Sequence, residues 1–179
     1  MEKVGVLALQ GSFAEHLAIL RRMPGIEPLE VKTIAQLEAV DRLIIPGGES
    51  TAVGKLLRKT GMLPLLQKRI EEGLAVWGTC AGLILLAKRI VGEEPYLDAM
   101  DITVKRNAYG SQLDSFRCEQ IIPAISAKPI HLVFIRAPWI EAVGAEVEVL
   151  AERDGRIIAA KQGRLLATSF HPELTQDTS

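Results

Sequence analysis

Apolar and polar residues alternate in short blocks along the first half of the chain, in the order that repeated strand–helix units produce. Four apolar runs have the length of buried strands, the second being weak: residues 4–9, 29–32, 42–45 and 74–77. Strands this apolar are typical of a parallel sheet that is covered on both faces. The pattern therefore predicts an α/β protein.

The segments between these strands predict helices. Ser12 and Glu15 have the spacing of a capping box, and Phe13, Leu17 and Leu20 fall on one face of the helix that would follow. Further helices are predicted after a capping pair of Thr33 and Gln36 and over residues 51–59, 62–72 and 81–89, with Gly61 and Gly73 as breaks.

The second half changes character, because from residue 102 onward most runs are strand-like. These runs are residues 102–106, 112–121, 131–135, 147–152, 156–161 and 164–170. Asp154-Gly155 between two of them is a strong signal for a two-residue hairpin turn. We therefore expect one domain over residues 1–179, a three-layer α/β sandwich. Its mostly parallel central sheet would be flanked by helices and carry an antiparallel extension in the second half.

Composition excludes several classes of function. The net charge of the 179 residues is −1, which gives no global field to attract nucleic acid or an anionic membrane. No apolar run approaches the ~18 residues of a membrane span, so a soluble cytoplasmic protein is expected. Cys80 and Cys118 are the only cysteines and lack a C-x-x-C spacing, so free thiols are expected. No histidine, cysteine or acidic pattern predicts a metal site.

A nucleophile is suggested by Gly78-Thr79-Cys80-Ala81-Gly82, which lies between an apolar strand and a helix. This is the G-x-nucleophile-x-G elbow with cysteine as the nucleophile. The turn places the sulfur at a helix N-terminus, which favours the thiolate, and points the Ala81 amide toward a developing oxyanion. The alternative is a small buried cysteine of structural importance only. Cys118, in a strand-like run, has no such context.

A cysteine nucleophile needs a base and a carboxylate that orients the base. His171 ends an apolar strand and is followed by Pro172 and Glu173, so its imidazole and that carboxylate can be neighbours. The elbow also follows a strand, and parallel strands present their ends along one edge of a sheet. The alternative is a charged strand terminus in solvent. His16, among apolar helix positions, and His131, at a strand start, suggest surface or half-buried structural roles.

A glycine-rich loop at residues 46–51 follows the third strand. Its consecutive glycines let backbone N–H groups approach a ligand, so Gly48 is a candidate second oxyanion donor. A phosphate-binding loop is excluded, because the spacing from Gly48 to Gly54-Lys55 is wrong and Leu56 stands where a hydroxyl is needed. A purely structural turn is the remaining alternative.

Together these motifs resemble class I (triad) glutamine amidotransferases and, more narrowly, the glutaminase subunit of pyridoxal 5′-phosphate synthase. The triad motifs indicate the superfamily, and the segments that carry arginine make the narrower assignment specific. The matching stretches are residues 5–11, 46–51, 77–86, 106–110 with 112–116, 134–138 and 170–174.

The resemblance implies a reaction and a set of roles. Cys80 would attack the side-chain amide of L-glutamine to form a glutamyl thioester and release ammonia, with His171 as general acid/base and Glu173 as its orienting partner. The implied glutamine contacts are Gly48, Glu49, Ser50, Arg106, Ile135 and Arg136. A carboxylate and guanidinium groups suit the charged ends of an amino acid, although each arginine could also be a structural ion-pair partner.

The resemblance also implies a partner, a barrel-shaped synthase subunit that uses the ammonia to build pyridoxal 5′-phosphate, with Gln10 near the interface. The glutaminase itself would need no cofactor or metal. Two departures stand out: Ser111 replaces a usual arginine, and relatives continue into a further helix beyond the position of Ser179. The alternatives are a cysteine hydrolase or peptidase on a similar fold and a non-catalytic regulatory subunit.

Overall fold

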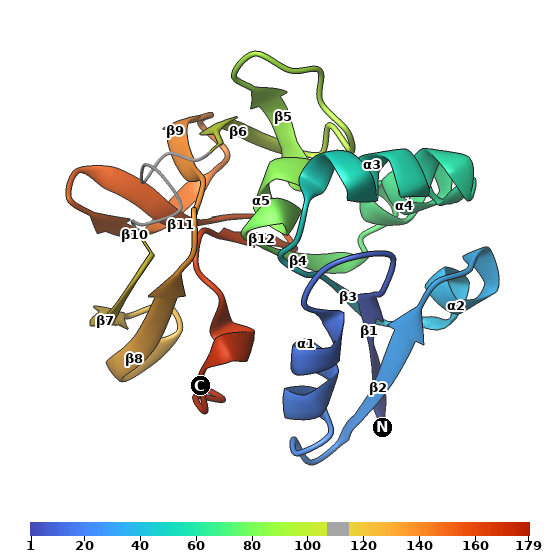
Figure 1. The fold of residues 1–179 in the computed structure, drawn as a ribbon, viewed down its shortest axis with the longest axis horizontal. Helices are drawn as coiled ribbons and strands as arrows, with labels where there is room; N and C mark the ends of the chain where they lie inside the picture. The colour runs from blue at the N-terminus through green and yellow to red at the C-terminus, as the bar shows by residue number, and fades with distance from the viewer. Residues whose placement is uncertain (107–114) are drawn as a thin grey trace.

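The computed structural model describes residues 1–106 and 115–179, whose strands and helices alternate in the first half of the chain as expected (Figure 1). The strands are β1 (Glu2–Leu7), β2 (Ile26–Val31), β3 (Arg42–Ile45), β4 (Ala75–Thr79), β5 (Ala87–Ile90), β6 (Met100–Lys105), β7 (Phe116–Ile122), β8 (Ser126–Phe134), β9 (Trp139–Val143), β10 (Glu148–Arg153), β11 (Arg156–Gln162) and β12 (Leu165–Thr168). The helices are α1 (Phe13–Leu20), α2 (Ile34–Ala39), α3 (Ser50–Lys59), α4 (Met62–Glu71), α5 (Ala81–Leu86) and the 3₁₀ turn η1 (Pro172–Leu174).

The main sheet joins a parallel half to an antiparallel half. Its strand order is β2-β1-β3-β4-β12-β11-β9-β6-β5, and β10 pairs with β11. The strands from β2 to β12 in this order are parallel, whereas β11 and β9 run antiparallel to their neighbours. This confirms the predicted α/β fold with a mostly parallel sheet and an antiparallel extension. β12 is the strand that belongs to both halves.

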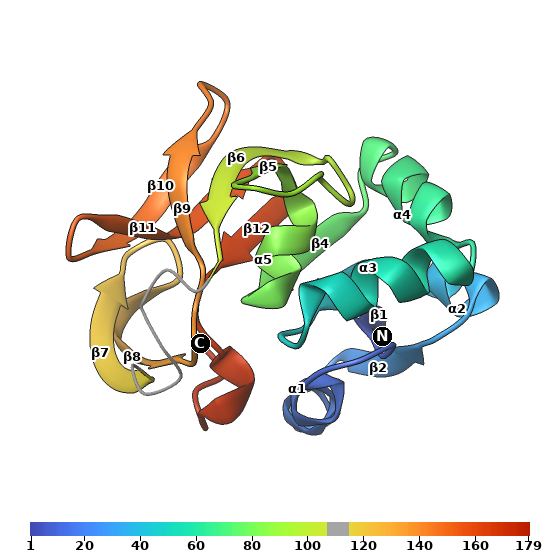
Figure 2. The same ribbon diagram turned by 45° about the horizontal axis from the view of Figure 1, so that its top comes forward.

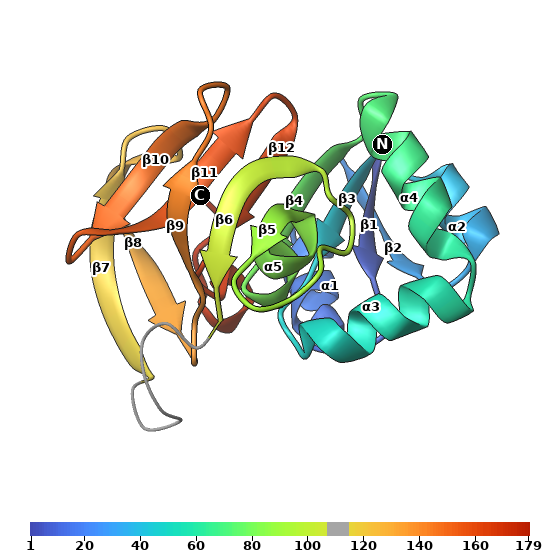
Figure 3. The ribbon, with the colours of Figure 1, turned by 90° about the horizontal axis from the view of Figure 1, so that it is seen from above.

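Helices cover the two faces of the parallel half unequally (Figure 3). Helices α2 to α5 lie on one face, where their apolar side chains join alternate strand residues such as Leu43, Ile45 and Val76 in the largest core cluster. Helix α1 lies on the other face, against Ile44 and Trp77. The two clusters use opposite sides of the same strands because successive strand side chains point to opposite faces.

The second half has its own small core. Strands β7 and β8 form a separate antiparallel ribbon beside the main sheet (Figure 2). Phe134 of β8 is fully buried, and its ring stacks on Phe116 at 4.7 Å and meets Phe170 edge-on at 6.1 Å. Since Phe170 follows β12, this cluster connects the ribbon to the segment that carries His171.

Three predictions of secondary structure were wrong. The helix expected over residues 81–89 ends at Leu86, because residues 87–90 pair with β6 as strand β5. Strand β9 was missed, and it pairs with β6 and β11, far away in sequence. Ser12 stands at the N-cap of α1 without a side-chain capping bond, because its hydroxyl is engaged elsewhere.

Other local signals were confirmed. Thr33 and Gln36 form the predicted capping box of α2. The hairpin between β10 and β11 turns at Asp154 and Gly155, both with positive φ, as a tight primed turn requires. Among residues 1–106 and 115–179, no helix is long and apolar enough to cross a membrane.

Candidate active site

The turn after β4 holds Cys80 in a strained backbone conformation. Its φ of 52° and ψ of −104° are uncommon for a residue with a side chain. The glycines on either side allow this turn to pack: a Cβ on Gly78 would meet the backbone of Gly82, and a Cβ on Gly82 would meet the carbonyl of Ile45. The predicted strand–elbow–helix geometry is therefore present, with Cys80 as the N-cap of α5.

The last strand brings His171 to this turn. β12 pairs in parallel with β4, with Thr168 opposite Thr79, so both strands end at the same edge of the sheet. The Cys80 amide donates to the Thr168 carbonyl at 2.8 Å, and the His171 amide donates to the Val133 carbonyl at 2.8 Å. The Cys80 and His171 side chains are hydrogen bonded to each other. The sulfur and the imidazole thus meet although they lie 91 positions apart in the chain.

Glu173 lies behind the imidazole, away from the sulfur. His171 Nδ1 is 2.6 Å from Glu173 Oε1, and the Ser12 hydroxyl donates to the same oxygen at 2.7 Å. The carboxylate is buried, which would raise its pKa, but its hydrogen bond to His171, the charge on His171 and the Ser12 bond hold the pKa below the usual value. Glu173 is therefore ionised and fixes the orientation of the imidazole.

The charge state of His171 follows from its two partners. Burial favours the neutral ring, but the hydrogen bonds and charges of Cys80 and Glu173 outweigh burial and raise the pKa of His171 to about 10. Near neutral pH the ring is therefore an imidazolium, in contact with Glu173 and Cys80. A cysteine beside an imidazolium can supply a nucleophile to attack a carbonyl, and the ring a proton for a leaving amine.

The glycine loop after β3 closes over the imidazole. A Cβ on Gly47 would collide with the His171 ring, and a Cβ on Gly11, whose φ is +105°, would collide with the Gly47 carbonyl. The Ser12 amide donates to this carbonyl at 2.9 Å. Only glycine fits at these two positions, because two loops and the catalytic ring come together there.

Gln10 fixes the next part of the same loop. Its Oε1 accepts the backbone N–H of Glu49 at 2.7 Å and lies against Gly48. The predicted interface residue is thus in contact with the residues predicted to bind glutamine and its oxyanion.

A cavity of about 510 Å³ opens in front of Cys80. Every residue predicted to bind glutamine lines it, together with the candidate nucleophile, its candidate base and the candidate oxyanion donors: Gly48, Glu49, Ser50, Cys80, Ala81, Arg106, Ile135, Arg136 and His171, with Ile84 and Pro138. Ser50 Oγ is buried and finds no hydrogen-bond partner in the described part of the chain. A free buried hydroxyl in a cavity suits a polar ligand.

The charged rim of the cavity is already paired. Arg106 contacts Glu93 and lies 3.3 Å from Glu49 Oε1 and 3.0 Å from Thr51 Oγ1. The Thr51 amide has the largest effect on the pKa of Glu49 and lowers it; burial opposes this, and Arg106 adds to the lowering, so the pKa lies below its usual value. The two groups expected to bind opposite ends of glutamine thus neutralise each other here. Ser111 lies outside the described residues.

Two neighbours of the triad were not predicted as site residues. Ser12 and His16 lie one helical turn apart at the start of α1, and His16 is buried rather than at the surface, with Nε2 3.4 Å from Glu173 Oε2. The available signal was position, since both lie at the start of the first helix, shortly after the end of β1. Cys118 and His131 lie on the β7–β8 ribbon, where Glu119 pairs with His131.

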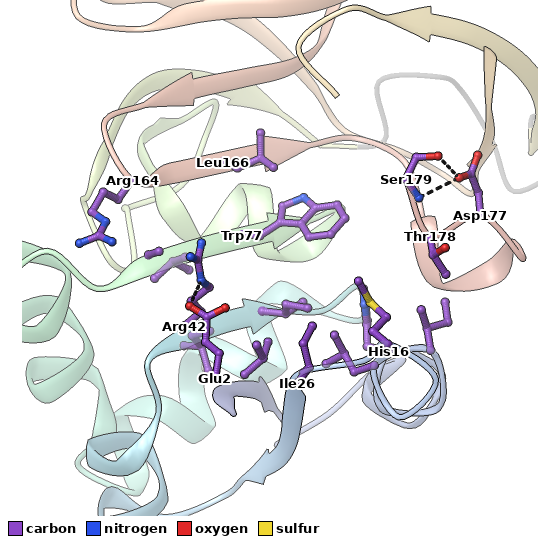
Figure 4. Close-up of a pocket in the computed structure, with 18 residues that line it drawn as sticks. Glu2, His16, Ile26, Arg42, Trp77, Arg164, Leu166, Asp177, Thr178 and Ser179 are labelled. Atoms are coloured by element: carbon purple, nitrogen blue, oxygen red, sulfur yellow. Dashed lines mark hydrogen bonds and ion pairs between the residues drawn. The ribbon is translucent and has the colours of Figure 1, made fainter. Parts of the chain in front are cut away.

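A second cavity, of about 400 Å³, lies on the α1 face of the sheet (Figure 4). Trp77 and Leu166 form its floor, His16 closes one end, and Asp177 to Ser179 form a side. The Trp77 indole donates to Thr168 Oγ1 at 3.0 Å. Within residues 1–106 and 115–179, no group of three or more His, Cys, Asp or Glu side chains could hold a metal ion.

Comparisons with known proteins agree with this site. The model of the SNO glutamine amidotransferase family matches residues 6–179. "Pyridoxal 5'-phosphate synthase subunit PdxT" of Caldanaerobacter subterraneus subsp. tengcongensis is 55% identical over 178 residues, covering 99% of this chain and 94% of that protein. The protein of the same name from Chloroflexus aurantiacus is 56% identical over 179 residues, covering 97% and 94%. A solved structure described as "Crystal structure of glutamine amidotransferase" has a TM-score of 0.90 and 50% identity, covering 97% of this chain and 92% of its own.

Proposed function

The chain belongs to the SNO glutamine amidotransferase family and is a glutaminase, and from this premise we propose that Cys80, His171 and Glu173 hydrolyse L-glutamine to L-glutamate and ammonia through a glutamyl thioester. The observation that carries the proposal is the hydrogen-bonded meeting of the Cys80 sulfur and the His171 imidazole at one edge of the sheet.

In the first half-reaction, the Cys80 thiolate attacks the side-chain amide carbon of glutamine. A C–S bond forms and the carbonyl electron pair moves to oxygen, where the backbone amides of Gly48 and Ala81 stabilise the negative charge. The His171 imidazolium gives its proton to the nitrogen, the C–N bond breaks and ammonia leaves. The enzyme then holds a glutamyl thioester and a neutral imidazole.

In the second half-reaction, water replaces ammonia. Neutral His171 takes a proton from the water as its oxygen attacks the thioester carbon, and the same two amides stabilise the second oxyanion. The C–S bond breaks, glutamate leaves, and the thiolate and imidazolium are restored. Glu173 remains ionised throughout and holds the ring in one orientation.

Recognition of glutamine uses the charged rim of the cavity. We assign the α-ammonium to Glu49 and the α-carboxylate to Arg106, with Ser50, Ile135 and Arg136 completing the pocket. Glu49 and Arg106 are paired with each other, so a zwitterionic ligand can replace each partner by one of its own ends without leaving a charge unpaired.

The names of the relatives suggest a partner for this chain. They are subunits of pyridoxal 5'-phosphate synthase, and we propose that this chain likewise delivers ammonia to a synthase subunit that makes pyridoxal 5′-phosphate. Gln10 is the proposed contact. Because it holds the Glu49 amide and lies against Gly48, a partner at Gln10 would act directly on the oxyanion and substrate loop. We expect glutaminase activity to rise when the synthase is added.

Cys80→Ala tests the proposal. With synthase present, we expect glutamine-dependent ammonia release to fall at least ~10³-fold, because no thioester can form, while binding to the synthase persists. Cys118→Ala, which removes the only other thiol, is the matched control and should keep full activity. Unchanged turnover in Cys80→Ala would exclude the mechanism. Cleavage of peptides rather than glutamine by the native chain would favour the peptidase alternative.

A further inference from the structure

The two carboxylate oxygens of Glu173 are held very differently. Oε1 has two short contacts, with His171 Nδ1 at 2.6 Å and the Ser12 hydroxyl at 2.7 Å. Oε2 is buried and makes no hydrogen bond within the described residues. A buried carboxylate oxygen with no donor is costly, and it leaves the group free to rotate about its last bond. Something must hold the second oxygen if Oε1 is to stay on the imidazole.

The imidazole of His16 lies within reach of Oε2. Its Nε2 is 3.4 Å from Oε2 and 3.5 Å from Thr79 Oγ1. The ring is only 4% exposed and stands edge-on to Trp77, with centroids 6.5 Å apart and planes at 77°. The His16 ring is therefore buried where α1 packs against β4 and η1, and its Nε2 faces the carboxylate.

The charge on His16 can be worked out from the groups that face it. Burial lowers its pKa, Glu173 opposes this, His171 adds to the lowering, and Glu15 on its own helix raises the pKa slightly. From β4, the uncharged Trp77 and Thr79 contact the ring. The net direction is downward, so His16 is neutral at pH 7 and carries one N–H. The carboxylate favours that proton on Nε2.

We propose that His16 is a positioning residue of the glutaminase reaction, donating its Nε2–H to Glu173 Oε2 and so keeping Oε1 on His171 Nδ1. The inference rests on the proposed function of the triad and extends it by a fourth member that touches neither substrate nor sulfur. A small movement of α1 closes the 3.4 Å separation to an ordinary hydrogen bond.

In this arrangement one carboxylate contacts two histidines, one protonated and one neutral. His171 is an imidazolium and His16 is neutral, so Glu173 balances a single positive charge. His16 also lines the cavity whose floor includes Trp77, so the same side chain lies between that cavity and Glu173 (Figure 4).

The test compares His16→Leu with His16→Gln. Leucine fills the apolar surroundings but offers no donor, whereas the glutamine amide nitrogen occupies roughly the place of Nε2 and can donate to Oε2. In the native complex, we expect His16→Leu to lower kcat about tenfold with KM unchanged within about twofold, and His16→Gln to recover most of the loss. The His171 pKa, followed by NMR, should fall below about 10 in His16→Leu only.

The NMR readout separates this inference from the triad proposal, since it needs no turnover. An inactive wild type would contradict the proposed function, whereas an active wild type with unchanged kcat and His171 pKa in His16→Leu would overturn the role of His16. A purely structural role would lower the thermal stability of both variants equally and leave the His171 pKa in place. If His16→Leu does not fold, His16→Asn replaces it, because its shorter amide ends about where Nδ1 lies and leaves Oε2 without a donor.

Discussion

The parallel and antiparallel halves of the sheet contribute different things to the cavity. The proposed nucleophile, its proposed base and the glycine loop come from the ends of adjacent parallel strands β4, β12 and β3. Arg106, Ile135 and Arg136 come from the ends of β6 and β8, in or beside the antiparallel half. The proposed reacting groups thus come from neighbouring parallel strands in the middle of the sheet, and the proposed recognition groups from strands in or beside its antiparallel half.

This difference shows which interatomic distances must be held precisely. Proton transfer requires distances correct to a fraction of an ångström, which neighbouring strands in fixed register supply. Binding the charged ends of an amino acid tolerates longer, more adaptable side chains. Changes at the recognition side chains should therefore affect glutamine affinity while the triad stays in place, whereas changes in the ribbon core should affect folding.

The largest effect expected in the antiparallel half is on stability. Phe134→Ala should lower the free energy of unfolding by ~3–5 kcal/mol, because the ring is fully buried between Phe116 and Phe170. Chemical denaturation measures this directly. Phe13→Ala, at a half-buried ring on α1, is the control and should cost less than half as much. A loss below ~1 kcal/mol for Phe134→Ala would mean that the second cluster adds little to the fold.

A smaller effect is expected on recognition. Arg106→Ala should raise the KM for glutamine about 10- to 100-fold with a much smaller change in kcat, since a charged hydrogen bond to the α-carboxylate is worth ~1.5–3 kcal/mol. Steady-state kinetics with the synthase present is the measurement. Arg89→Ala removes a comparable ion pair, with Asp101, outside the cavity and should leave KM unchanged. An equal effect of the two variants would contradict the assignment.

The subtlest test concerns pH. The pKa of His171 is raised from 6.5 to about 10 in the folded protein, so its protonation stabilises the fold fully below pH 6.5, and this stabilisation is lost as pH rises through 10. Cys80→Ala removes one hydrogen bond and one charge that raise this pKa. In an NMR titration of that variant, the His171 pKa should move down toward 6.5. The same titration of Cys118→Ala should match the native protein, and a pKa held at about 10 without Cys80 would show that Glu173 alone sets it.

The parts of the fold that depend on local chemistry were predictable. The Thr33 and Gln36 capping box and the Asp154-Gly155 turn depend on residues close in sequence, and both are present. The Cys80 elbow and the strand ending before His171 were also readable, because parallel strands share one edge.

The predictions that failed concern segments whose structure depends on residues far away in sequence. Residues 87–90 look helical but pair with β6, and β9 exists because β6 and β11 flank it. Ser12 has the spacing of a cap, but its hydroxyl bonds to Glu173, which is remote in sequence. His16 looked like a helix-face residue for the same reason, since nothing near it in sequence indicates that a carboxylate from the chain's last turn would lie against it.

The backbone at Cys80 has a consequence for how this protein can lose activity. A φ of 52° with a ψ of −104° is tolerated by glycine and disfavoured, by ~1–3 kcal/mol, for any residue with a side chain. The native sequence therefore gives up folding stability to keep a thiol there. Cys80→Gly would therefore make the protein more stable but inactive, so selection for folding stability alone would favour loss of the glutaminase activity.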